Sequence, residues 1–123
     1  MAAPNLIGAT TINGKTAGVS LTTTSATSVL NNASSSGKCL KVNTLNVSNT
    51  TGSPVNITIS WYNQASLGGT AFAIASAVSV PGNATLNVID KSSQYYLEEN
   101  TILGATAGVS NSLIVTVSYE DIS

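Results

Sequence analysis

The chain has 123 residues, of which only 7% are charged, and its four lysines and five acids leave a net charge of −1 at pH 7. With no arginine and no histidine, it offers no basic field to attract nucleic acid. It also lacks the imidazole that activates a serine nucleophile, and with one cysteine and no histidine it leaves little besides carboxylates to bind zinc. We therefore predict no enzymatic activity, no catalytic residue, no cofactor and no metal site.

The hydrophobic pattern predicts strands and very little helix, because apolar residues alternate with polar ones and turn residues recur at short intervals. The clearest alternation places Val55, Ile57, Ile59 and Trp61 on one face, which we expect to be buried. In chain order the predicted strands cover residues 7–12, 16–23, 26–30, 39–49, 55–62, 72–80, 85–89, 95–97, 101–107 and 113–120.

The fourth of these strands contains a break in its alternation. Leu40 and Val42 share one phase, whereas Leu45 and Val47 share the other. A β-bulge inserts one extra residue and would return both pairs to the same face. We therefore predict a bulge near Asn43.

The strand pattern predicts an all-β fold: a single antiparallel β-sandwich of about eight strands, jelly-roll or Ig-like, with a barrel as the alternative. We expect one domain over residues 1–123. Residues 1–6 contain Pro4 and fall outside the alternation, so we predict an extended N-terminal arm that reaches a neighbour. The end of the strand at 72–80 is marked by the turn Pro81-Gly82-Asn83.

Glu98 and Glu99 stand side by side in YYLEEN and are the clearest candidates for chemistry in so uncharged a sequence. Adjacent side chains of an extended strand point to opposite faces, so the two carboxylates would not act as a pair. Calcium sites usually need several oxygen ligands in one compact loop, and no such pattern occurs. We interpret both residues as solvated charges on a sheet edge.

Two other motifs have structural interpretations. Gly14-Lys15-Thr16 matches the end of a phosphate-binding loop, but the first glycine of that motif would fall on Ala9, and the residues that follow are poor helix formers. Cys39 has no cysteine with which to form a disulfide within the chain, and we predict that it is a small buried apolar side chain.

Aromatic residues offer the best platform for a ligand, because aromatic rings stack on sugars. Trp61 and Tyr119 fall on the inward faces of their predicted strands. Tyr62 and one of Tyr95 or Tyr96 are expected to lie outside. A glycan-binding, host-contact function at these residues is therefore an alternative function.

The sequence also favours a cytoplasmic origin. MAAPNLIGATT has neither the basic start nor the apolar run of a signal peptide, and no segment approaches the roughly 20 apolar residues of a membrane span. We predict no membrane partner. The near-neutral surface is compatible with close packing against many copies or a larger body, and equally with a soluble, hydroxyl-rich monomer.

Three segments, GKCLKVNTLNVSN (residues 37–49), YLEEN (96–100) and VSYEDIS (117–123), resemble small virion structural proteins of tailed phages, in particular phages of cyanobacteria. The similarity extends over most of the chain, including TTINGKTA. The resemblance implies a noncatalytic β-sandwich carried in many copies on the virion, as a decoration or cement protein of the head. A neck or tail accessory protein is the alternative. It also implies contacts with the major capsid protein or other virion proteins, and a homo-oligomer, but no binding role for any single residue.

Overall fold

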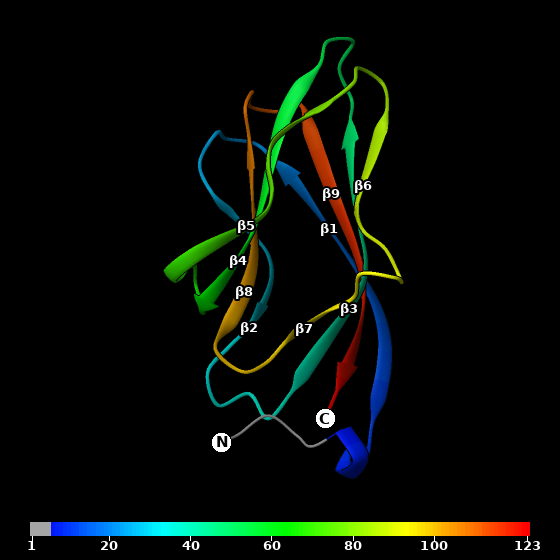
Figure 1. Cartoon of the computed structure of the whole chain (residues 1–123), viewed down its shortest axis with the longest axis vertical. Coiled ribbons are helices and arrows are strands. Elements are labelled where there is room, and N and C mark those ends of the chain that lie inside the picture. The colour runs from blue at the N-terminus through cyan, green and yellow to red at the C-terminus, as the bar shows by residue number, and fades with distance from the viewer. Residues whose placement is uncertain (1–5) are drawn as a thin grey trace.

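The computed structural model describes residues 6–123, which are built almost entirely from strands (Figure 1). In chain order the elements are η1 (Leu6–Gly8), β1 (Ile12–Leu21), β2 (Thr27–Asn32), β3 (Cys39–Asn49), β4 (Val55–Gln64), β5 (Gly68–Val80), β6 (Thr85–Ile89), β7 (Tyr95–Leu97), β8 (Thr101–Ala107) and β9 (Leu113–Ile122). η1 is a single 3-10 turn. The predicted all-β fold is therefore confirmed.

The strands form two antiparallel sheets packed as a sandwich. One sheet has the order β1-β9-β3-β6, with β7 also paired to β3, and the other has the order β2-β8-β4-β5. The pairing is nested about the β4–β5 hairpin: β3 pairs with β6 and β7, β2 with β8, and β1 with β9. This nesting is the jelly-roll arrangement rather than the Ig-like one. β6 and β7 occupy successive stretches along one side of β3, which explains nine strands instead of about eight.

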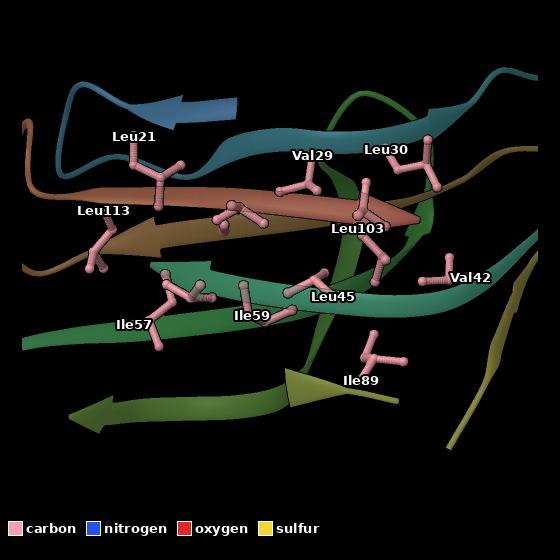
Figure 2. Close-up of a cluster of buried hydrophobic side chains, with 14 of the residues drawn as sticks. Leu21, Val29, Leu30, Val42, Leu45, Ile57, Ile59, Ile89, Leu103 and Leu113 are labelled. Atoms are coloured by element: carbon pink, nitrogen blue, oxygen red, sulfur yellow. The ribbon is translucent and has the colours of Figure 1, made fainter. Parts of the chain in front are cut away.

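The hydrophobic core fills the space between the two sheets (Figure 2). Val55, Ile57 and Ile59 of β4 are almost completely buried, as their alternation predicted. Leu45 of β3 and Leu103 of β8 are also fully buried and join the same cluster. Burial of a side chain of this size stabilises the fold by about 1.5–3 kcal/mol.

The predicted bulge in β3 is confirmed. Val42 lies opposite Tyr119 and Thr44 lies opposite Ser118, so Asn43 has no partner of its own on β9. Leu45 and Val47 are consequently buried on the same face as Val42. The bulge allows a sequence with a phase slip to form one continuous strand.

The strand predicted over residues 7–12 is wrong. Residues 6–8 form η1, and β1 begins only at Ile12. The ladder between β1 and β9 continues only as far as Thr11, which exchanges backbone bonds of 2.9 Å with Ser123 in both directions, and the residues before it turn into η1. The arm predicted for residues 1–6 lies outside the described residues, except for the backbone of Leu6.

A buried asparagine fixes the loops at each end of the sandwich. Asn49, at the end of β3, is 2% exposed, and its Nδ2 donates to the carbonyls of Ser53 and Val80 at 2.8 and 3.0 Å. Asn32, at the end of β2, is also 2% exposed and donates in the same way to the carbonyls of Lys38 and Leu97, both at 2.9 Å. Each amide satisfies two carbonyls that the strand ladders leave unpaired.

The turn between β5 and β6 stacks on the turn between β3 and β4, and this contact gives a testable prediction. A Cβ on Gly82 would lie 2.5 Å from the carbonyl carbon and oxygen of Gly52. The two turns are also joined by a 2.8 Å bond from the Asn83 N–H to the Thr51 carbonyl. Because backbone atoms cannot move aside as a flexible side chain can, we expect Gly82→Ala to lower the free energy of unfolding by about 1–3 kcal/mol.

Urea denaturation of the two alanine variants, Gly82→Ala and Gly52→Ala, tests this contact. Gly52→Ala is the matched control from the facing turn, since its Cβ would meet nothing within 4 Å. Equal stability of the two variants would contradict the close approach of the turns.

Candidate functional site

The charged residues are distributed very unevenly over the sandwich. All of them except Asp90 and Lys91 lie in or beside β1, β3, β7 and β9. We call the group Lys15, Lys38, Lys41, Glu98, Glu99, Glu120 and Asp121 the charged end, which is the lower end in Figure 1, near the C-terminus. The fold brings these residues together, because β3 pairs with both β7 and β9, and β9 pairs with β1.

Two lysines converge on one buried carboxylate at this end. The Nζ atoms of Lys15 and Lys38 lie 2.9 and 3.2 Å from the same oxygen, Oδ2 of Asp121. The Asp121 side chain is 7% exposed, whereas the lysine side chains are 46% and 45% exposed. Asp121 therefore holds two solvent-accessible ammonium groups close together.

The contacts within this cluster shift the pKa values of Asp121 and Lys15 in the directions that favour their charged forms. Burial opposes the charge on Asp121, but the hydrogen bonds from Lys15 and Lys38 outweigh it, so the pKa of the carboxyl lies below its ordinary value. The hydrogen bond to Asp121 in turn raises the pKa of Lys15. Asp121 and Lys15 are therefore both charged at neutral pH.

The stability of the fold should consequently depend on Asp121 in acid. Because the folded pKa of this carboxyl is lower than the unfolded value near 3.8, its ionised form adds stability above that pH, and the contribution is lost as the pH falls below it. We expect Asp121→Asn to be less stable than wild type at pH 7 and to lose less stability between pH 7 and acid. Urea midpoints measured across this pH range, with the exposed Glu98→Gln as control, check the prediction. Parallel profiles for Asp121→Asn and wild type would contradict it.

The two glutamates singled out in the sequence occupy different environments. β7 ends at Leu97, so both glutamates follow the strand, and the expectation that their side chains point to opposite faces of a strand does not apply. Glu98 is exposed, as predicted, but Glu99 is partly buried. Oε2 of Glu99 accepts the Gly37 N–H at 3.0 Å, while Oε1 is buried without a hydrogen-bond partner. Glu99 thus fixes the β2–β3 loop and is more than a solvated edge charge.

The aromatic residues do not form one platform. Tyr62 and Leu67 lie over the outer surface of the four-stranded sheet, since a Cβ on Gly104 would meet both side chains at 2.8 Å. Tyr95 and Tyr96 are 36% and 49% exposed on β7 of the other sheet. Trp61 is packed partly against the core, as predicted, and forms a ring pair with Phe72 at 5.6 Å. A ligand platform on β7 would therefore not include Tyr62.

The environments of Cys39 and of the Gly14-Lys15-Thr16 motif agree with the structural interpretations made from the sequence. Cys39 is buried, and burial raises the pKa of its thiol. The tripeptide lies within β1 and not at the start of a helix. Neither forms a nucleophile or a phosphate-binding loop.

The four-stranded sheet has the opposite character to the charged end. None of β2, β4, β5 and β8 contains a charged residue, so we call this the uncharged sheet. The four connections at the upper end in Figure 1, residues 22–26, 50–54, 81–84 and 108–112, contain none either. Hydrogen bonds tie these connections together, such as the 3.0 Å bond from the Thr50 N–H to the Ser112 carbonyl.

β5 forms the open edge of the uncharged sheet. It is 13 residues long, and within residues 6–123 it pairs only with β4. Most of its side chains are exposed, including Phe72 at 51% and Val78 at 37%. Its regular pairing is interrupted near Ala77, which has a positive φ of 48° and whose N–H donates to the Thr58 hydroxyl. A long, uncharged and partly apolar edge is a site for pairing with another chain.

Two kinds of site do not occur in the described part of the chain. Among residues 6–123, no three His, Cys, Asp or Glu side chains are grouped so that they could hold a metal ion. No helix in the same range has the length and apolar character needed to cross a membrane.

Comparisons with known proteins do not assign the chain to a family. No family model matches it, and no curated protein matches its sequence.

Proposed function

We propose that the chain is a non-enzymatic structural protein of a phage virion, a decoration or cement protein that stabilises the head shell in many copies. The observation that carries the proposal is the uncharged sheet with its open β5 edge. Burying a charge in an interface is costly, and the cores of protein interfaces are depleted of charged residues. A surface made of β2, β4, β5 and β8 can be covered by a neighbour without that cost.

Two further observations support this function. Jelly rolls are common among viral capsid domains, although lectins and cupins share the fold, so the fold alone does not select among them. The segments in which we see a resemblance to virion proteins include β3, part of β7 and most of β9, and these strands lie side by side in one sheet. In this proposal the protein is made in the host cytoplasm and incorporated into the virion.

The proposed partners are the major capsid protein and further copies of the chain. Copies would associate through β5, because a strand edge without charges can pair with its own copy about a two-fold axis. The pairing of β5 with β4 is interrupted in three places and is regular over residues 71–73 and 78–80. Phe72 and Ala73 lie in the first of these stretches and are exposed.

Quantitative mass spectrometry of purified particles tests the proposal. Copy numbers in the hundreds are expected for a protein that coats the shell. About a dozen copies or fewer would instead indicate a ring at the neck or tail, and the protein would then be an accessory protein and not a decoration protein. Absence of the protein from particles would contradict both.

Glycan binding is the second candidate function, favoured by the exposure of both Tyr95 and Tyr96 on β7. A glycan array with the wild-type protein, Tyr96→Ala and Tyr62→Ala tests it. Binding that is lost in Tyr96→Ala and kept in Tyr62→Ala would support it. No binding to any bacterial polysaccharide would eliminate it.

A further inference from the structure

The charged end contains a cavity, which is separate from the uncharged sheet used in the proposed function. The cavity has a volume of about 270 Å³ and lies where β1 and β9 of one sheet approach β2 of the other. That volume equals roughly nine water molecules and is slightly below the range of drug-sized ligand sites. It suits a molecule the size of a monosaccharide or a substituted benzene ring.

One wall of the cavity is cationic. Lys15 and Lys38 line it together with Asp121, whose Oδ2 they share. Each ammonium group has three N–H donors, and the bond to Asp121 occupies one of them. The three side chains carry a net charge of +1, and the lysines retain donors that can reach a ligand.

Part of the remaining lining is apolar, and Asn31, Asn32, Ala33 and Ser36 complete it. Leu30 and Leu40 also line the cavity and are 7% and 5% exposed. Tyr119 lines it as well, with its side chain packed partly against the core. A ligand here would bury an apolar face against these three residues while its charged group met the lysines.

The position of Lys38 is fixed before any ligand arrives. Its carbonyl accepts a bond from the buried Asn32 amide at 2.9 Å, and its N–H donates to the Ser36 hydroxyl at 3.2 Å. Lys15 projects from a strand that is paired with β9 along its whole length. Such preorganisation reduces the entropy lost on binding.

We propose that this cavity binds a small organic monocarboxylate, with the carboxylate held between Lys15 and Lys38 and the body of the ligand against Leu30, Leu40 and Tyr119. The net charge of +1 balances a monoanion, whereas a dianion such as phosphate would leave one negative charge beside Asp121. A neutral molecule would leave the net charge of +1 on these three side chains unbalanced. This proposal does not depend on the virion function.

Titration followed by backbone amide NMR shifts provides the test. The probes are benzoate and glucuronate, with benzyl alcohol, glucose and inorganic phosphate as controls of different charge. We expect at least one carboxylate to shift the amide signals of Leu30, Lys38 and Leu40, while its neutral counterpart does not. Lys15→Gln and Lys38→Gln should each weaken that binding about tenfold, the loss of roughly one charged hydrogen bond.

Lys91→Gln is the matched control, because it removes the same charge from an exposed turn outside the cavity and should leave the affinity unchanged. Shift mapping on the wild type keeps the test decisive even where a lysine variant does not fold. The proposal is overturned if neither carboxylate binds, or if the shifts map away from the cavity. Equal binding of the neutral counterparts, or binding of phosphate alone, also overturns it.

Discussion

A lysine introduced on β5 should prevent copies of the protein from associating while leaving the fold intact. Ala73 lies in the middle of this strand, is exposed, and pairs only with Ser60 of β4. A charge on an open edge opposes strand pairing, because association would either desolvate the ammonium group or bring it close to the same ammonium group of the second copy. We expect wild type to associate with rising concentration in sedimentation velocity experiments, and Ala73→Lys to remain monomeric. The loss of affinity should be about 100-fold or more.

Thr116→Lys is the matched control for this experiment. Thr116 is also exposed, but it lies on β9, which has a neighbour on both sides. The variant adds the same charge to a surface that has no open edge and should associate as wild type does. Association through β5 would be contradicted if the wild type stayed monomeric at all concentrations. It would also be contradicted if Ala73→Lys and Thr116→Lys lost the same amount of self-association affinity.

The second large effect is expected at Asn49. Its Oδ1 accepts from the N–H and the hydroxyl of Thr51, at 2.9 and 2.8 Å, while its Nδ2 donates to two carbonyls. Aspartate has the same shape but no donor, so it would place a carboxylate against the Ser53 and Val80 carbonyls in a buried site. We expect Asn49→Asp to lower the free energy of unfolding by about 3–5 kcal/mol, measured by urea denaturation at pH 7.

Asn56→Asp controls for the chemical change alone. Asn56 is on β4, is exposed, and can become charged without desolvation. Its replacement should alter stability by less than about 0.5 kcal/mol. If Asn49→Asp were as stable as Asn56→Asp, Asn49 would not fix the loops in the way described.

The local features of the fold could be predicted from the sequence because they depend on neighbouring residues. The alternation of Val55, Ile57 and Ile59 identified β4, and the phase slip in β3 identified its bulge. The bounds of β6, β7 and β8 also match their predictions. The start of β1 was predicted wrongly because it depends on pairing with β9 at the far end of the chain, and that ladder reaches back only to Thr11, opposite Ser123.

The jelly-roll pairing and the cavity could not be predicted in the same way. Alternation shows which face of a strand is buried, but not which strand lies beside it. Lys15, Lys38 and Asp121 are far apart in sequence and meet only because β9 lies between β1 and β3. The one available signal was the scarcity of charge, since a buried acid requires a cationic partner and the chain has only four lysines.

Electron cryo-microscopy of the virions into which we propose that the chain is incorporated tests the proposed function most directly. The map should show the nine-stranded sandwich repeated over the head shell, with the uncharged sheet turned toward the shell or toward neighbouring copies and β5 edges in contact. Particles that carry the protein with β2, β4, β5 and β8 facing solvent would contradict the role of that surface. The virion function itself would be contradicted if other proteins explained all the density of the head and tail and none of it matched this sandwich.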